Sequence, residues 1–243
     1  MQSGVLVAFV MLGVQTYLLQ AGSLNVVEIT NRLAQNESLK RNTIQEFAAT
    51  RRYILRNSHW HHDAVMVVRV SFKRGEGKTF QVLDVQGAEG LSRRVLERVM
   101  QGEEQDSRSA RPDESSVTPA HYDFRMLGME TIAGRNCYVL ETKPKMKSRY
   151  LLQGKAWVDA QDFALIRIEG RPSASLGFWA GKPYIVQQFE KQGDFWMASH
   201  NRSQSESHLL GKSELNIEYT AYDLNCSGSK RLAARRSAAA SLE

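Results

Sequence analysis

Cysteine is scarce in this chain, and its spacing excludes redox chemistry. The 243 residues include two cysteines, Cys137 and Cys226, and no Cys-x-x-Cys pair, so a dithiol redox motif is absent. Cys137 begins one predicted strand and Cys226 ends the last. The two are therefore candidates for a single disulfide in an oxidising compartment. Two buried free thiols are the alternative.

Signatures of catalysis and of metal binding are also missing. His59, His61 and His62 precede Asp63, but adjacent strand residues such as His61 and His62 point to opposite faces. No second ligand cluster accompanies them, and no G-x-S-x-G elbow frames a serine. The sequence therefore predicts no metal, no cofactor and no enzyme activity. A hydrolase with an unrecognised site is the weakest alternative.

The chain has no apolar run of the roughly 20 residues that a spanning helix needs. Residues 1–27 hold no charged side chain, and residues 5–14 are almost continuously apolar. An apolar run of about 7–15 residues followed by small residues, here Ala21-Gly22-Ser23, is typical of a secretory signal. We expect residues 1–23 to be a signal peptide of an exported, periplasmic protein. An uncleaved N-terminal anchor is the alternative.

Excess charge is concentrated at the C-terminal end. The formal net charge is +6, and half of it lies in residues 227–243, where Lys230, Arg231, Arg235 and Arg236 outnumber Glu243. This Ser/Ala-rich segment is predicted to be a disordered basic tail. Transient contact with an anionic membrane is one role for it, and a solvated segment without a role is the favoured alternative. The remaining body is not basic enough to predict a nucleic-acid partner.

Alternating apolar and polar residues fill most of the body. Residues 150–169 give the clearest hairpin, with Asp159 and Asp162 at a turn that their side chains can cap. About ten such strands and two substantial helices follow from the same patterns. The predicted fold is mainly β (α+β), a large curved antiparallel sheet in one domain over residues 24–226.

Two amphipathic helices are predicted to cover that sheet. Asn25 caps the first, and Val26, Val27, Ile29 and Leu33 lie along one side of it. The second covers residues 92–106, with an apolar stripe and with Glu103 among the charged residues of its other side. We expect two helices to leave part of the apolar sheet face uncovered. An acyl chain suits that remainder, at about 0.8 kcal/mol for each methylene removed from water.

The predicted lipid site combines residues from the helix, the sheet and an irregular aromatic segment. For each residue the alternative is ordinary packing in the hydrophobic core, since helix stripes and strand faces pack the interior more often than they bind ligands. The aromatic pair of the irregular segment could equally close one end of the core. The candidate cavity or lid residues are Met66, Val68, Val70, Val95, Leu96, Val99, Met100, Trp157, Phe178 and Trp179.

A family resemblance supports this interpretation. The segments LNVVEITNRLAQ, FAATRRYIL, MVVRVSF, GKTFQVL, YDFRMLGMETIAGRNCYVLE, GKAWVDAQDFALIRIEG, FWMASHNRSQSE and LLGKSELNIEYTAYDL resemble bacterial exported proteins of the outer-membrane lipoprotein-sorting (LolA/LolB-like) superfamily. The resemblance covers roughly residues 24–224. It implies an open half-barrel with helices in its concave side, where acyl chains are sheltered.

The resemblance also implies a strand arginine that holds a lid closed. Arg51, Arg52, Arg69 and Arg167 lie on predicted strands, and the sequence does not single one out. The expected function is a periplasmic lipid- or lipoprotein-binding protein with little head-group selectivity and with a membrane release or acceptor protein as partner. The alternative is an envelope sensor or interaction module that binds an apolar segment of a protein partner in the same hollow.

Overall fold

The computed structural model describes residues 25–108, 115–175, 183–207 and 211–226. These residues form two helices and ten strands, in agreement with the sequence. The elements are α1 (Val26–Thr43), β1 (Ile44–Asn57), β2 (Ala64–Lys73), β3 (Gly77–Gln86), α2 (Gly90–Arg108), β4 (Tyr122–Ile132), β5 (Arg135–Pro144), β6 (Leu152–Asp159), β7 (Leu165–Pro172), β8 (Tyr184–Gln192), β9 (Phe195–Ser207) and β10 (Gly211–Cys226).

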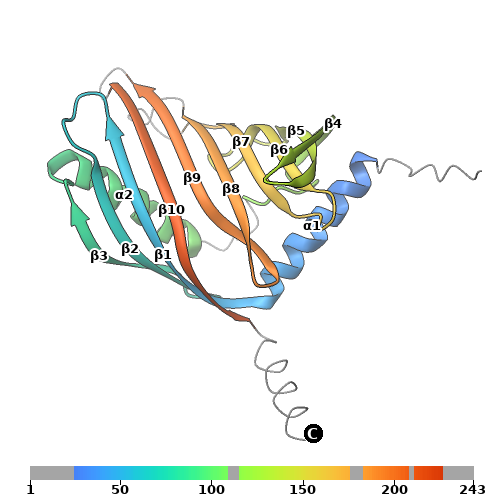
Figure 1. The fold of residues 1–243 in the computed structure, drawn as a ribbon, viewed down its shortest axis with the longest axis horizontal. Helices are drawn as coiled ribbons and strands as arrows, with labels where there is room; N and C mark the ends of the chain where they lie inside the picture. The colour runs from blue at the N-terminus through green and yellow to red at the C-terminus, as the bar shows by residue number, and fades with distance from the viewer. Residues whose placement is uncertain (1–24, 109–114, 176–182, 208–210, 227–243) are drawn as a thin grey trace, which may run out of the picture.

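All ten strands belong to one antiparallel sheet in the order β3-β2-β1-β10-β9-β8-β7-β6-β5-β4 (Figure 1). Neighbours in the sequence pair throughout, except that β1 pairs with β10 and that α2 connects the two edge strands. Within the described residues, β3 and β4 each have one unpaired edge, so the sheet is open. The predicted mainly β fold with a large antiparallel sheet is therefore confirmed.

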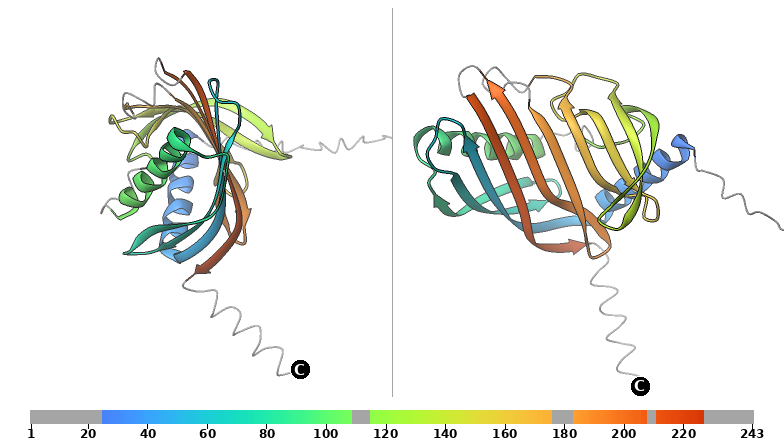
Figure 2. Two further views of the ribbon diagram at one scale, coloured as in Figure 1. Left: turned by 90° about the vertical axis from the view of Figure 1, so that its left-hand side faces the viewer. Right: turned by 45° about the horizontal axis from the view of Figure 1, so that its top comes forward.

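The sheet curls around both helices. In the left-hand view of Figure 2, α1 and α2 lie on the same, concave side of the curled sheet. Bulges interrupt several strand pairs, including β2–β3, β4–β5, β6–β7 and β8–β9, and bulges bend and twist the strands that carry them. At the β6–β7 pair, Gly154 faces Gly170, and a Cβ at Gly154 would lie 2.0 Å from the Glu169 carbonyl oxygen.

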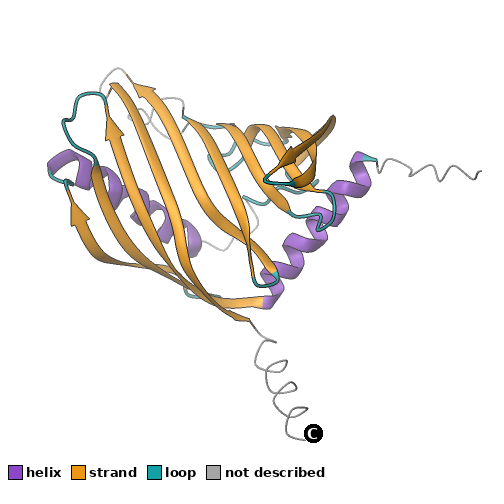
Figure 3. Ribbon diagram, in the orientation of Figure 1, coloured by secondary structure: helices purple, strands orange, loops and turns teal. Residues whose placement is uncertain are grey.

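The two helices lie toward opposite ends of the sheet (Figure 3), and each packs against its own apolar cluster. The α1 cluster joins Ile29 and Leu33 to residues of β4–β7, and the α2 cluster joins Leu96 and Met100 to residues of β1, β2 and β10. Buried members of the α1 cluster from the sheet and its loops are Val117, Tyr122, Leu140, Leu151, Leu152, Ala156, Val158, Leu165 and Ile168. Those of the α2 cluster are Tyr53, Leu55, Ala64, Met66, Val68, Val70, Ala88 and Ile217.

The predicted N-terminal helix cap and hairpin turn are confirmed. The Asn25 side chain accepts a hydrogen bond from the Glu28 backbone N–H at 2.9 Å, and Asp159 accepts from the backbone N–H groups of Gln161 and Asp162. Val27, expected on the buried side of α1, is instead 62% exposed. No described helix is long and apolar enough to cross a membrane.

The proposed disulfide is absent, because the strand order keeps its two cysteines apart. Cys137 is a buried free thiol on β5, whereas Cys226 ends β10, and β9, β8, β7 and β6 lie between those strands. Neighbouring strands are about 4.8 Å apart, and the Cα atoms of a disulfide lie within about 7 Å. The alternative of a buried free thiol is what the structure shows for Cys137.

Candidate functional site

The underside of α2 is the candidate site, because its sheet-facing stripe meets most of the residues predicted to bind lipid. Leu96 and Met100 are buried against strands β1 and β2, where Met66, Val68 and Val70 are also buried. Val95 and Val99 are partly buried at the margins of this cluster. The structure brings these seven residues together as a packed interface between helix and sheet. Their role in binding lipid stays a prediction.

The same stripe becomes charged toward the C-terminal end of α2. The Glu103 carboxylate accepts from Arg51 Nη1 at 2.7 Å and from Lys78 Nζ at 2.5 Å. Arg51 belongs to β1 and is 4% exposed, and it also donates to the Tyr53 hydroxyl at 3.2 Å. Of the four strand arginines that the resemblance left open, Arg51 is the one that binds the helix.

Electrostatic forces hold this triad, defined as Arg51, Lys78 and Glu103, in its charged form. Burial disfavours the Glu103 carboxylate, but the charges and hydrogen bonds of Lys78 and Arg51 outweigh burial and lower its pKa to about 2. Burial opposes the charge of Arg51 as well, yet the neighbouring groups raise its pKa further above the usual range. Both ions therefore persist across the physiological pH range.

The triad was missed because Glu103 looks like a surface residue in the sequence. It follows Leu96 and Met100 at helical spacing, seven and three residues later, and this places it on the same side of α2. The sequence interpretation assigned it to the charged, exposed side. An acidic residue that continues an apolar stripe is the signal that could have revealed the buried contact, together with a cation on the facing strand.

The two ends of α2 attach to the sheet in different ways. At its first end, Gly87 in the short connection from β3 and Gly90, the first residue of α2, both have left-handed φ (+60° and +49°). At the far end, the Lys78 backbone N–H donates to Ser107 Oγ at 2.7 Å. Gly77, with φ of +86°, lies so close that an added Cβ would be 2.8 Å from Arg108 Cγ. The C-terminal end of α2 therefore packs directly against the start of β3.

Between the two helix-covered ends, the inward side of β9 is polar, whereas Ile185 and Phe189 of β8 pack against the α1 cluster. No residue of β8, and none of residues 195–206 in β9, is fully buried. Ser203 and Asn201 pair with Leu215 and Ile217, which face α2, and Asn201 donates to Gln187 on β8 at 2.8 Å. At β9 the uncovered concave surface is therefore polar and not apolar as expected, and the buried apolar clusters lie beneath the helices.

Trp157 does not join the candidate site. Its neighbours along β6, Ala156 and Val158, belong to the α1 cluster, so Trp157 points to the opposite, convex face. There it packs with Cys137, Val139 and Ile166, and its indole N–H donates to Glu130 at 2.8 Å. This corrects its assignment to the cavity. The two other aromatic candidates, Phe178 and Trp179, lie outside the described residues.

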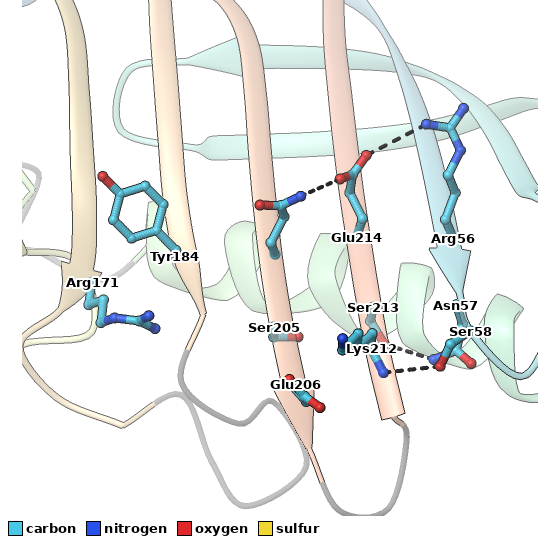
Figure 4. Close-up of a pocket in the computed structure, with 11 residues that line it drawn as sticks. Arg56, Asn57, Ser58, Arg171, Tyr184, Ser205, Glu206, Lys212, Ser213 and Glu214 are labelled. Atoms are coloured by element: carbon cyan, nitrogen blue, oxygen red, sulfur yellow. Dashed lines mark hydrogen bonds and ion pairs between the residues drawn. The ribbon is translucent and has the colours of Figure 1, made fainter.

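A groove of about 720 Å³ crosses the convex face near one rim of the sheet (Figure 4). Leu55 and Leu215 face α2, so their neighbours Arg56 and Glu214 point the other way, and both line this groove. Glu214 accepts from Arg202 at 2.6 Å and from Gln204 at 2.7 Å. The polar side chains of neighbouring strands therefore pair with one another here, as is usual on the exposed face of a sheet.

Metal chemistry finds no support in the described part of the chain. It contains no group of three or more His, Cys, Asp or Glu side chains arranged to hold an ion. His59 instead packs against the backbone of Gly211, where an added Cβ would lie 2.4 Å from its Nε2 atom. These residues form part of the rim of the sheet.

Comparison with protein families gives one match, and it includes α2 and much of the sheet. Residues 66–170 match the model of the MucB/RseB N-terminal domain. This is less than half of the chain, and it contains α2, Met66, Val68 and Lys78. The comparison with curated proteins gave no match.

Several solved structures are similar in fold. A LolA superfamily protein from Nitrosomonas europaea has 14% identity and a TM-score of 0.45, over 84% of this chain and 94% of the other. A putative outer membrane lipoprotein-sorting protein domain from Vibrio parahaemolyticus has 20% identity and a TM-score of 0.45, over 82% and 92%. The Pseudomonas aeruginosa MucA/MucB complex has 8% identity and a TM-score of 0.26, over 84% and 96%. The curved open sheet with helices on its concave side, which the LolA/LolB-like resemblance implied, is the fold seen in Figure 2.

Proposed function

We propose that the protein is a periplasmic, non-enzymatic binding protein that shelters acyl chains between α2 and the concave face of the sheet. One observation carries this proposal: a single apolar cluster is formed partly by α2 and partly by the sheet beneath it. Met66, Val68 and Val70 form the floor, and Leu96 and Met100 form the cover. A helix that moves away leaves an apolar floor that an acyl chain can fill.

The connections of α2 support its role as the moving part. It joins β3 through a short segment with two glycines in left-handed conformation, Gly87 and Gly90, and such segments absorb the backbone rotations of a hinge. Leu91, at the start of α2, is 50% exposed. The helix is held at its other end by Arg51 and Lys78, which act on a single carboxylate. The Lys78 N–H bond to Ser107 and an Arg149–Asp106 ion pair add to this attachment, so opening breaks a small set of polar contacts at the C-terminal half of α2.

The cost of opening is comparable to the gain from a bound chain. Exposing two buried side chains of the size of Leu96 and Met100 costs about 3–6 kcal/mol. A chain of eight methylenes placed on the floor recovers roughly 6 kcal/mol at 0.8 kcal/mol each. Short acyl chains should therefore bind poorly, and chains longer than about eight carbons should bind measurably.

A second candidate is an interaction module that binds an apolar segment of a protein partner in the same place. The match of residues 66–170 to the MucB/RseB N-terminal domain favours it, because that stretch supplies α2 and much of the floor. The two candidates share the opening of α2 and differ in the occupant.

Native mass spectrometry of the protein purified from its own envelope fraction tests the proposal. A bound acyl lipid supports the first candidate, and a stoichiometric protein partner supports the second. Titration of the purified protein with a fluorescent long-chain fatty acid completes the test. If neither species co-purifies and the fatty acid fails to bind at micromolar concentrations, the proposed function is contradicted.

A further inference from the structure

We propose that the site beneath α2 selects amphiphiles with an anionic head group, a carboxylate or a phosphate, and that Glu103 occupies the head-group position when the site is closed. The inference rests on the proposed function and adds the chemistry of the ligand. It departs from the poor head-group selectivity expected from the sequence, because the structure adds a charged site to the apolar floor.

The buried stripe of α2 has the same polarity as such an amphiphile. Its apolar part, Leu96 and Met100, lies on the floor, and its one carboxylate follows at Glu103. From Ser92 to Glu103 the helix rises about 16 Å at 1.5 Å per residue. This is close to half of the roughly 30 Å hydrocarbon thickness of a bilayer, which is the length of one leaflet of acyl chains. An acyl chain with a terminal anion therefore matches the stripe in length and in order.

The charges of the triad favour a second anion. Arg51 and Lys78 supply two positive charges, and Glu103 supplies the carboxylate that contacts both. Each cation binds a different oxygen of that carboxylate, so any head group with two oxygens on one centre can replace it. Arg51 Nε is buried and has no hydrogen-bond partner among the described residues. That N–H is a further donor for a phosphate oxygen.

Arg51 remains in position when α2 leaves, because most of its contacts come from the sheet. Its guanidinium lies 4.6 Å from the centroid of the Tyr219 ring and 5.8 Å from that of Phe80. Its Nη1 also reaches the Tyr53 hydroxyl. Tyr219, Phe80 and Tyr53 belong to β10, β3 and β1. The cation is therefore preorganised for an incoming anion, which reduces the entropy lost on binding.

Calorimetric titration with four probes tests this inference: laurate, dodecyl phosphate, the neutral monolaurin and inorganic phosphate. The wild-type protein should bind laurate and dodecyl phosphate at least about tenfold more tightly than monolaurin, as expected for charge-assisted hydrogen bonds. Inorganic phosphate should neither bind nor compete at millimolar concentrations. Phosphate that binds as tightly as dodecyl phosphate would overturn the inference in favour of a site for free anions.

Variants separate selection from anchoring. Glu103→Gln should strengthen binding of the two anionic probes about tenfold more than binding of monolaurin. Lys78→Gln should remove most of the preference, so that laurate and dodecyl phosphate bind no more tightly than monolaurin does, and it avoids the deeply buried Arg51. Lys155→Gln, an exposed lysine on β6, is the control for net charge and should change nothing.

The outcomes distinguish this inference from the proposed function. Equal affinity for laurate and monolaurin in the wild-type protein, unaltered by Lys78→Gln, would show that the triad only anchors α2. The inference would then fail while acyl binding stands. If no amphiphile binds to the wild-type protein or to Glu103→Gln, acyl binding itself fails. An equal gain for all amphiphiles in Glu103→Gln would also overturn the inference, because it indicates loosening of α2 without selection.

Discussion

The two helix-covered ends of the sheet each bury an apolar cluster but are fastened in different ways. At the α1 end, the helix runs directly into β1, and Ile44 both caps α1 and begins the strand. Asn36 of α1 also bonds to the Phe163 carbonyl at 3.1 Å. At the α2 end, a glycine-bearing connection and a charged triad take these roles. In the proposed function, the α1 end therefore stays in the core and the α2 end is the part that separates.

The largest expected difference concerns one paired arginine at each end, Arg51 of β1 beneath α2 and Arg32 within α1. Arg51→Leu leaves Glu103 without its buried partner, so the free energy of unfolding should fall by about 3–5 kcal/mol. Arg32→Leu on α1 removes an exposed pair with Glu28 and should cost less than about 1 kcal/mol. Urea denaturation measures both. Similar losses for the two variants would contradict the distinction drawn here.

Leucine truncations should cost about the same at both ends. Leu33 and Leu96 are each fully buried, and Leu→Ala in a core costs roughly 2–5 kcal/mol. Their effect on ligand uptake should differ, because only Leu96 covers the proposed site. In stopped-flow mixing with a fluorescent fatty acid, Leu96→Ala should bind faster than wild type, and Leu33→Ala should bind at the wild-type rate. A faster rate for Leu33→Ala alone would reverse the roles of the two helices.

Acid should weaken the α2 end through Glu103. Its pKa is lowered to about 2 in the folded protein, below the value of about 4.3 for an unperturbed Glu. The stabilisation is therefore complete above about pH 4.5 and is lost as the pH falls toward 2, and it amounts to roughly 2 kcal/mol after allowance for partial exposure. The pKa values of Asp159, Glu141 and Glu214 are also lowered.

Comparison with Glu103→Gln therefore isolates this contribution from that of the other carboxylates. The difference in unfolding free energy between wild type and Glu103→Gln should shrink by roughly 2 kcal/mol between pH 5 and pH 2. A difference that stays constant over this range would show that Glu103 is not held in its charged form by the triad.

The smallest expected effect comes from two glycines that contact or form α2. Gly102 lies inside the helix with open space around its Cα, so Gly102→Ala should stabilise the protein by about 0.5–1 kcal/mol. Gly77→Ala should destabilise it, because the residue has a left-handed φ and the new methyl would meet Arg108. Thermal denaturation measures both. Changes in stability of the same sign for the two variants would contradict the described packing of α2 against Gly77.

The sequence predicted the helices and strands at both ends and missed the contacts between distant segments. Alternation of apolar and polar residues predicted the strands, and helical spacing predicted that Leu33 and Leu96 lie on buried faces. The polar inward side of β9 was missed, because it depends on which face of that strand points inward, and the pairing of Ser203 with Leu215 decides that. Trp157 was misplaced for the same kind of reason. A bulge beside it in the β6–β7 pair places Ile166 and Trp157 in the same convex cluster.

Opening of α2 on ligand binding is the central claim, and a distance between spin labels tests it most directly. Labels on Gln105, near the C-terminal end of α2, and on Lys155 of β6, both exposed, report the position of α2 in a protein whose two cysteines are replaced by serine. A pair on Gln35 of α1 and Lys155 is the control. Saturating laurate should lengthen the Gln105–Lys155 distance and leave the control unchanged. An unaltered Gln105–Lys155 distance in protein with bound laurate would contradict the account.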